Sequence, residues 1–303
     1  MKNIITLFSF ILVITSCDVV EGPYEIDTGN IIPTDTNTFV KKILIEDFTG
    51  HRCKNCPNAA RELETIHEVY GDQIIGMALH VTTGYARPSQ IGSTEWNNEE
   101  YRYDFRTESG NAWYDFFDIS NPGLPNGMVN RTGYPNNHKL GYSEWASKAA
   151  EELQKEIDFG ITILTNFSGD EGIITINTDI LNNISGSYNL VVCLTESNII
   201  NTQLDGSILK QDYIHNHVLR TTISENQLSS SSSYNSGDTI SRPFSFNLND
   251  LQQDNIDYSN NTAEAGNGNA AGWDSSNMSV IAYIYDNTTQ EILQVEEAHL
   301  MTK

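Results

Sequence analysis

The most informative segment of the chain is residues 47–57, which read DFTGHRCKNCP. The apolar run of residues 40–48 predicts a strand that leads into it. In residues 57–70, apolar side chains recur every three to four positions, which predicts a helix. A second apolar run, residues 73–81, predicts another strand. Two strands that flank a helix indicate a βαβ unit with parallel strands and a right-handed crossover.

Two cysteines, Cys53 and Cys56, stand at the junction of this strand and helix. A Cys-x-x-Cys pair at this point of a βαβ unit is typical of thioredoxin-like redox motifs. The intervening two residues place both sulfurs within bonding distance on the first helical turn. In the catalytic interpretation, the positive end of the helix favours a thiolate at Cys53, which attacks a substrate disulfide, and Cys56 resolves the mixed disulfide.

The alternative interpretation is a static disulfide that fixes the start of the helix in an exported protein. Lys54 and Asn55 replace the Gly-Pro pair of the thioredoxin motif, and His51-Arg52 stand where a Trp would precede the first cysteine. These departures favour the static bond, and the oxidoreductase remains the alternative.

Thioredoxin-like folds also carry a cis-proline opposite the dithiol, directly before a later strand. Residues 124–129, LPNGMV, offer this arrangement, and Pro125 is the candidate for the third member of a catalytic site. An insertion rich in aromatic residues, about 82–118, separates it from the cysteines and is in a position to roof them. Residues 142–157 predict an amphipathic helix that closes this part of the chain.

From residue 158 onward, short alternating runs replace the strand–helix pattern, and helix signals are scarce. Segments 229–233 and 263–272 are polar, low in complexity and expected to be exposed. The predicted strands are residues 161–167, 172–180, 188–194, 244–248, 280–285 and 292–296. The predicted fold class is therefore α/β plus all-β: a thioredoxin-like N-terminal domain, residues 39–157, followed by a C-terminal β-sandwich, residues 158–303.

The start of the chain predicts export and lipidation. Residues 1–16 combine a positive start with an apolar stretch that is too short to span a membrane, which indicates a signal peptide. The sequence Ile14-Thr15-Ser16-Cys17 is similar to a bacterial lipobox, in which the cysteine receives a diacylglycerol and its amino group is acylated after cleavage. We expect a lipid such as palmitate at Cys17 to anchor the protein to a membrane, with residues 17–38 as a tether.

Composition and the remaining candidate ligands exclude several function classes. With 40 Asp+Glu against 17 Lys+Arg, the net charge is −23, which argues against nucleic acid as a partner. No second Cys-x-x-Cys completes a zinc site, and Cys193 is expected to be a buried thiol. His215 and His217 share one face if their segment is extended, either as metal ligands or as a hydrogen-bonded structural pair, and we favour the pair. We expect neither a metal nor a cofactor.

Three motifs together carry a family resemblance: residues 45–50 leading into 53–59, residues 127–131 and residues 215–220. They resemble the outer-membrane-protein-28-related lipoproteins of Bacteroidetes. The resemblance implies an outer-membrane lipoprotein with a thioredoxin-like domain and a β-rich domain, on a side of the membrane that it does not specify. It implies little biochemistry, so we expect an interaction or structural role, with a protein or peptide as the candidate partner.

Overall fold

The computed structural model describes residues 39–121 and 123–300. The predicted signal peptide (1–16), the lipidated Cys17 and the tether (17–38) lie outside the described residues. Every helix within the described ranges is too short or too polar to cross a membrane.

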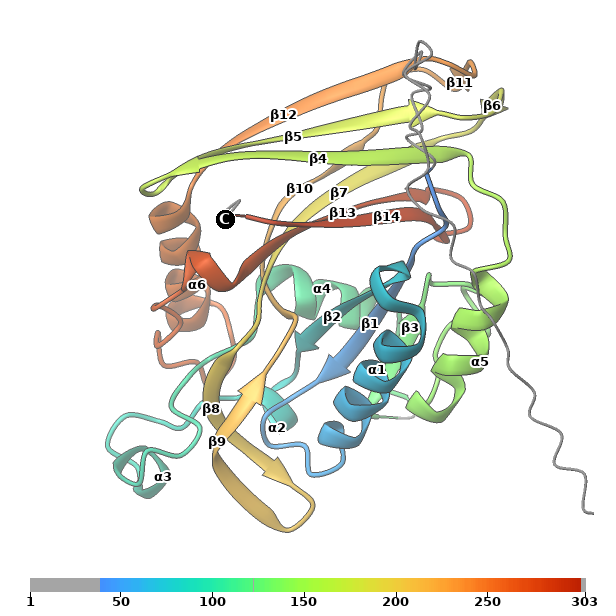
Figure 1. Cartoon of the computed structure of the whole chain (residues 1–303). Helices are drawn as coiled ribbons and strands as arrows, with labels where there is room; N and C mark the ends of the chain where they lie inside the picture. The colour runs from blue at the N-terminus through green and yellow to red at the C-terminus, as the bar shows by residue number, and fades with distance from the viewer. Residues whose placement is uncertain (1–38, 122, 301–303) are drawn as a thin grey trace, which may run out of the picture. The chain divides into compact units, whose positions relative to one another are not determined.

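The predicted strand–helix–strand unit is confirmed (Figure 1). Strand β1 (Ile43–Thr49) leads into helix α1 (Cys56–Tyr70), a short 3₁₀ turn (Gly71–Gln73) follows, and strand β2 (Ile74–His80) pairs with β1 in parallel. Strand β3 (Asn126–Val129) pairs with the other edge of β1 in the antiparallel sense. Helix α5 (Tyr142–Glu152) lies beside α1 and ends five residues before the predicted residue 157.

One seven-stranded sheet joins the two predicted domains, in the order β14-β13-β7-β10-β2-β1-β3. Strand β10 (Val218–Gln227) pairs with β2 in parallel through Val218 and Ala78. Antiparallel pairing then adds β7 (Tyr188–Glu196), β13 (Met278–Asp286) and β14 (Ile292–His299).

The sheet extends across the expected boundary near residue 157, and contacts group the chain from Phe39 onward into one unit. Periodicity predicts which residues form a strand, but it does not predict that the free edge of β2 receives β10.

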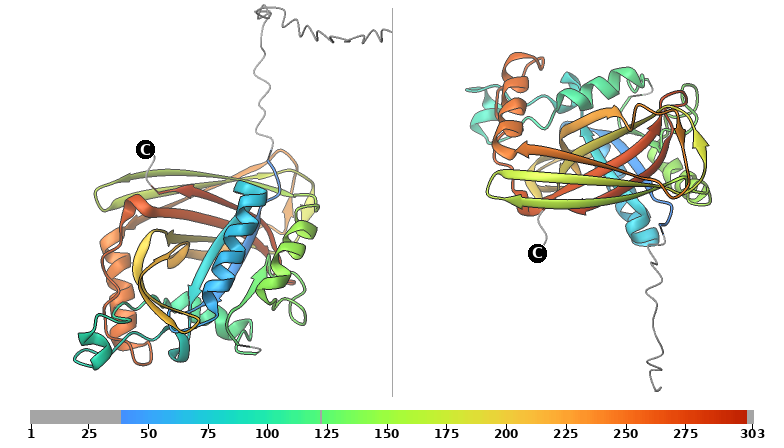
Figure 2. Two further views of the ribbon diagram at one scale, coloured as in Figure 1. Left: turned by 60° about the horizontal axis from the view of Figure 1, so that its bottom comes forward. Right: turned by 90° about the horizontal axis from the view of Figure 1, so that it is seen from above.

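A second sheet packs against the larger one. Its strands, β12 (Thr239–Asn247), β5 (Glu171–Ile180) and β4 (Phe159–Ser168), are antiparallel and lie across the β7 and β13 part of the larger sheet (Figures 1 and 2). The predicted face-to-face packing of two sheets is therefore present, but one of them is shared with the βαβ unit. Two-residue strands β6 (Ile184–Ser185) and β11 (Ser233–Tyr234) pair separately.

Both faces of β1 are buried, and alternation of the strand divides its side chains between them. Ile43 and Ile45 pack towards α1 and α5. Leu44 and Phe48 pack on the opposite face, against residues of helix α4 (Glu108–Phe116) and the β13–β14 strands. The polar residues Glu46 and Asp47 consequently lie on opposite faces of the same strand.

Several elements were not predicted. Helix α6 (Leu248–Asn261) is polar along most of its length and is capped at its start by Asn247, whose side chain accepts a hydrogen bond from the Asp250 N–H. Strands β8 (Ile199–Asp205) and β9 (Ile208–His215) form a hairpin. Gly206 takes the positive φ of 61° that its tight turn needs, so the Asp-Gly pair was the available signal. A 3₁₀ turn (Ser275–Asn277) precedes β13.

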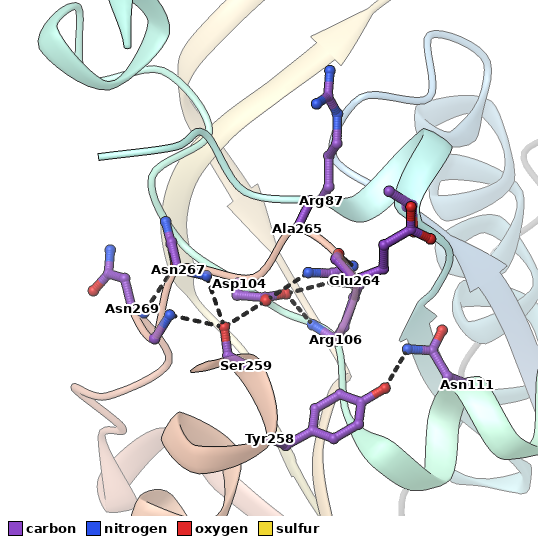
Figure 3. A network of polar contacts seen from close by, with 12 residues as sticks. Arg87, Asp104, Arg106, Asn111, Tyr258, Ser259, Glu264, Ala265, Asn267 and Asn269 are labelled. Carbon is purple, nitrogen blue, oxygen red and sulfur yellow. Dashed lines mark hydrogen bonds and ion pairs between the residues drawn. The ribbon is translucent and has the colours of Figure 1, made fainter. Parts of the chain in front are cut away.

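The aromatic insertion contains α2 (Thr83–Ala86), α3 (Thr94–Asn97) and α4, and a buried polar network ties it to residues 258–269 (Figure 3). Asp104 forms a bidentate ion pair with Arg106, and the Ser259 hydroxyl donates to Asp104 at 2.7 Å. The Asp104 N–H donates to the Asn269 carbonyl oxygen at 2.9 Å. Residues 263–272 are thus not the freely exposed loop that was predicted, because their backbone satisfies buried polar groups of the insertion.

Candidate active site

Cys53 and Cys56 form a disulfide bond at the start of α1, with their Cα atoms 5.4 Å apart. Helix α1 begins at Cys56 and has Pro57 in its first turn, where the missing N–H of proline costs no helical hydrogen bond. The two cysteines are only 2% and 1% exposed. The sulfurs are therefore sealed inside the protein in this conformation.

The β8–β9 hairpin seals the disulfide loop through backbone hydrogen bonds. The Leu204 N–H donates to the His51 carbonyl oxygen at 2.8 Å, and the Gly206 N–H donates to the Lys54 carbonyl oxygen at the same distance. The buried Gln203 amide donates to the Cys53 carbonyl oxygen at 3.2 Å. The hairpin thus provides cover that we expected from the aromatic insertion.

The insertion instead holds the residues that precede Cys53. The Arg52 N–H donates to the Tyr85 carbonyl oxygen at 2.9 Å. The guanidinium group of Arg52 makes a bidentate ion pair with Glu95 and lies over the ring of Tyr101. The positive charge of Arg52, next to Cys53, is therefore neutralised by a carboxylate.

Pro125 lies beside the end of β1, because the next residue, Asn126, is opposite Phe48 in the sheet. The Leu124–Pro125 peptide bond, whose isomer the sequence left open, is cis, and so is Tyr134–Pro135. A catalytic role for Cys53, Cys56 and Pro125 remains a prediction.

A cavity of about 250 Å³ lies between α1, the ends of β1 and β2, and the hairpin. Cys56 lines it, and so does Asp47, which sequence analysis did not single out. Its position could have been inferred from the sequence. Side chains alternate along β1, so Asp47, two residues after Ile45, lies on the same face of the strand as Ile45. Burial raises the pKa of Asp47 to about 8, and its Oδ1 atom has no hydrogen-bond partner.

Buried histidines occupy the β2 and hairpin side of this site. His80 and His215 line the cavity, and their ring centroids are 5.5 Å apart. Burial lowers the pKa of His215 to about 3 and that of His80 well below its usual range. His51, next to Arg52, is also buried, and burial lowers its pKa to about 3. The three imidazoles are therefore uncharged at neutral pH.

His215 and His217 both line the cavity, but their backbones differ. His215 ends β9, whereas His217 has a φ of 56° and is not extended. The His217 carbonyl oxygen accepts a hydrogen bond from the Ala78 N–H at 2.8 Å, which joins the segment to β2. In residues 39–121 and 123–300, no group of three or more His, Cys, Asp or Glu side chains has the geometry of a metal site.

The third cysteine of the described part, Cys193, is a buried thiol, as predicted. Its Sγ lies 3.6 Å from the Thr222 hydroxyl, and burial raises its pKa to about 12. It is therefore unsuited to act as a thiolate.

The opposite face of β1 carries a complete polar cluster. Arg131 donates two hydrogen bonds to Glu46, at 2.9 and 2.7 Å, and a third to the Tyr283 hydroxyl at 2.8 Å. The Arg131 guanidinium also lies over the rings of Trp113 and Phe117. These groups are buried and paired with one another, which marks a structural cluster.

The chain is similar to known proteins in sequence and in fold. The family model described as "Outer membrane protein Omp28" matches residues 110–303. HBP35 of Porphyromonas gingivalis has a TM-score of 0.58 at 15% identity, over 87% of this chain and 76% of that one, which shows a similar fold. No curated protein matches the chain.

Two further solved structures match with lower TM-scores. Protein AGR_C_4864 from Agrobacterium tumefaciens has a TM-score of 0.44 at 12% identity, over 87% of this chain and 96% of that one. A domain of the outer membrane lipoprotein Omp28 from Porphyromonas gingivalis has a TM-score of 0.29 at 16% identity, over 48% of this chain and 88% of that domain.

Proposed function

The chain belongs to the Omp28 family of outer membrane proteins, and from this membership we propose that it is a lipid-anchored outer-membrane protein with an interaction or structural role. In this proposal its thioredoxin-like fold carries a static Cys53–Cys56 disulfide, and its partner is a protein or peptide. The strand order β2-β1-β3, with α1 after β1 and a cis-proline before β3, supports the thioredoxin-like assignment.

The burial of the disulfide is the observation that carries the static role. A catalytic dithiol needs its first cysteine accessible to a substrate and held in an electropositive setting. Cys53 is only 2% exposed, the hairpin hydrogen-bonds to its loop, and Glu95 neutralises Arg52. These features support a bond that stabilises the start of α1.

The reduction potential of the Cys53–Cys56 pair tests this role. We expect a value below about −300 mV, which is typical of structural disulfides. We also expect no insulin reduction that depends on Cys53, measured by comparing the wild-type protein with Cys53→Ser and with Cys193→Ala as the matched control. A potential in the range of redox proteins, together with turnover lost only in Cys53→Ser, would show that the bond is catalytic.

Asp47 favours a second candidate function, an extracytoplasmic thiol–disulfide oxidoreductase. In the reduced protein, the Cys53 thiolate would attack a substrate disulfide and release one substrate thiolate, which takes up a proton. The Cys56 thiol would give its proton to the Asp47 carboxylate, and its sulfur would attack Cys53 to release the second substrate thiol. Asp47 and Cys56 line one cavity, and a carboxyl with a pKa of about 8 is matched to this proton transfer.

The substitution Asp47→Asn separates the two candidates. If the protein is an oxidoreductase, the reduced Asp47→Asn variant should turn over a disulfide substrate more slowly than the wild-type protein. The variant should also lose the pH dependence of turnover that Asp47 contributes. The static role requires that neither the wild-type protein nor the variant turns over a disulfide substrate. The oxidoreductase also requires the hairpin to open during turnover. Hydrogen exchange of the Leu204 and Gly206 amides measures this opening.

The membrane anchor is tested at Cys17. We expect mass spectrometry of the native protein to find an amino terminus at acylated Cys17, and Cys17→Ala to move the protein to the soluble fraction. An uncleaved or differently cleaved amino terminus would refute the anchor and leave the proposal for the disulfide unaffected.

A further inference from the structure

We propose that the cavity beside the disulfide binds a primary ammonium group, carried by a small amine or by a lysine side chain. Asp47, His80 and His215 form the site. This inference concerns a ligand rather than the disulfide, and it holds whether the Cys53–Cys56 bond is static or reactive.

The cavity is lined by buried polar side chains that lack hydrogen-bond partners. Asp47, His80 and His215 are 2%, 4% and 4% exposed. Asp47 Oδ1, both nitrogens of His80 and His215 Nε2 have no partner. Buried polar atoms are nearly always hydrogen-bonded in folded proteins, so several atoms around one cavity without a protein partner mark a place where a ligand or ordered water completes their hydrogen bonds.

The protonation states leave one acceptor atom on each of these three side chains. Backbone groups of Asn201 and Thr202 hydrogen-bond the ring of His215, whereas its Nε2 has no partner. A neutral imidazole that donates through one nitrogen accepts through the other, so His215 Nε2 is an acceptor. His80 has one acceptor nitrogen in either tautomer. Asp47 Oδ1 is the third acceptor.

A primary ammonium group matches this set. It has three N–H donors and no acceptor. Asp47 supplies the counter-charge when it gives up its proton to solvent, and the burial that makes its unpaired carboxylate costly favours a cation beside it. An anion would find one donor, the remaining N–H of His80, but it would also face the Asp47 carboxyl group and the acceptor nitrogen of His215. A metal ion does not fit, because the described residues contain no group of three such side chains that could hold one.

The rest of the cavity suits a short alkyl chain and its charge. Pro57, Leu63 and Ile214 provide an apolar lining. At the exposed mouth, Arg61 is paired with Asp205 at 3.2 Å, which leaves the carboxylate of Glu64 facing the opening. The chain's net charge of −23 attracts cations. A volume of about 250 Å³ is below the usual range for drug-sized ligands, so one small amine or one side chain fills it.

The test is a titration of the oxidised full-length protein with n-butylammonium. The NMR signals of the His80 and His215 rings and of the Asp47 carboxyl group monitor binding. We expect saturable shifts and a lower pKa for Asp47 at saturation, because a cation stabilises its charged form. 1-Butanol, which has the same chain without the charge, should produce neither. No saturable shift with n-butylammonium, or an equal response to 1-butanol, would overturn the proposal.

A second probe distinguishes the two sources of the ammonium group. N-Acetyl-lysine-N-methylamide presents the same group on a peptide backbone. If it binds as well as n-butylammonium, the natural ligand class is a lysine side chain. If only n-butylammonium binds, the ligand class is a free amine. Either result supports the ammonium site.

Variants assign the binding to the proposed residues. Asp47→Asn and His215→Gln should each weaken n-butylammonium binding about tenfold or more, the effect of losing one hydrogen bond to a charged group. His138→Gln is the matched control, because His138 is also a buried histidine with one unpartnered nitrogen but does not line the cavity. If Asp47→Asn does not fold, His215→Gln still decides the question. Unchanged affinity in a folded His215→Gln protein contradicts the site.

Discussion

The two faces of β1 place adjacent acidic residues in opposite situations. Glu46 pairs with Arg131 inside a cluster in which the ionic groups are hydrogen-bonded. Asp47 is equally buried, but it faces a cavity with an unpartnered oxygen. Burial of an ionisable group is therefore not by itself a sign of function. The sign is burial without a partner, beside space that a ligand can occupy.

The largest expected effect on stability is at the face of β1 that carries the Glu46–Arg131 cluster. Arg131→Ala leaves Glu46 as an uncompensated buried charge, which costs about 3–5 kcal/mol in the free energy of unfolding. Arg61→Ala is the matched control, since Arg61 forms an ion pair at the surface, and such pairs contribute about 0–1 kcal/mol. Urea denaturation measures both. Equal losses in the two variants would mean that the Glu46 cluster does not stabilise the fold.

At the other face of β1, Asp47 beside the cavity should make the stability of the protein depend on pH. The folded pKa of Asp47, about 8, lies above its ordinary value of 3.8. The folded protein therefore holds one more proton between these values, and its stability falls as pH rises through them, by up to about 1.4 kcal/mol per pH unit. We expect Asp47→Asn to remove this slope and to be the more stable protein at pH 8. Parallel stability curves for the two proteins between pH 4 and 8 would contradict the buried, unpartnered carboxyl.

Sequence reasoning predicted local structure better than neighbours in space. The strand–helix–strand unit around Cys53 and the six strands after residue 158 follow from periodicity, because alternation and helical spacing are local properties. The pairing of Val218 with Ala78 is not local, and no pattern in either segment specifies it. The shared sheet was therefore missed.

The site was predicted in part for the same reason. The cysteine pair and Pro125 were visible as motifs, and the disulfide and the cis bond are present. The cover over the disulfide was assigned to the wrong segment, because Gln203 reaches the Cys53 loop across 150 residues. Asp47 is the first residue of the segment 47–57 that contains the cysteine pair. Only its burial beside a cavity distinguishes it from other acidic residues of the chain.

The hairpin lines the cavity and covers the disulfide, and Gln203 holds the hairpin in place. Gln203→Ala removes the hydrogen bonds that its amide donates to the Gly50, Cys53 and Leu204 carbonyl oxygens. We expect a loss of about 1–3 kcal/mol, the cost of leaving buried acceptors unpaired. We also expect faster reduction of the disulfide by dithiothreitol. Gln211→Ala, on the same hairpin but exposed, is the control. An unchanged reduction rate in Gln203→Ala would show that the hairpin does not limit access to the sulfurs.

The smallest expected effects on stability come from two tyrosines, one in the Glu46–Arg131 cluster and one beside the Asp47 cavity. Tyr283 accepts a hydrogen bond from Arg131, and its hydroxyl is buried in the complete cluster. Tyr283→Phe should therefore cost about 1 kcal/mol or somewhat more. Tyr213 lines the open cavity, so Tyr213→Phe should change the free energy of unfolding by less than about 0.5 kcal/mol, as most substitutions away from buried networks do. If Tyr213→Phe were the more costly change, polar groups of the cavity face would already be satisfied within the protein. The distinction between the two faces, and with it the reason to expect a ligand beside Asp47, would then be lost.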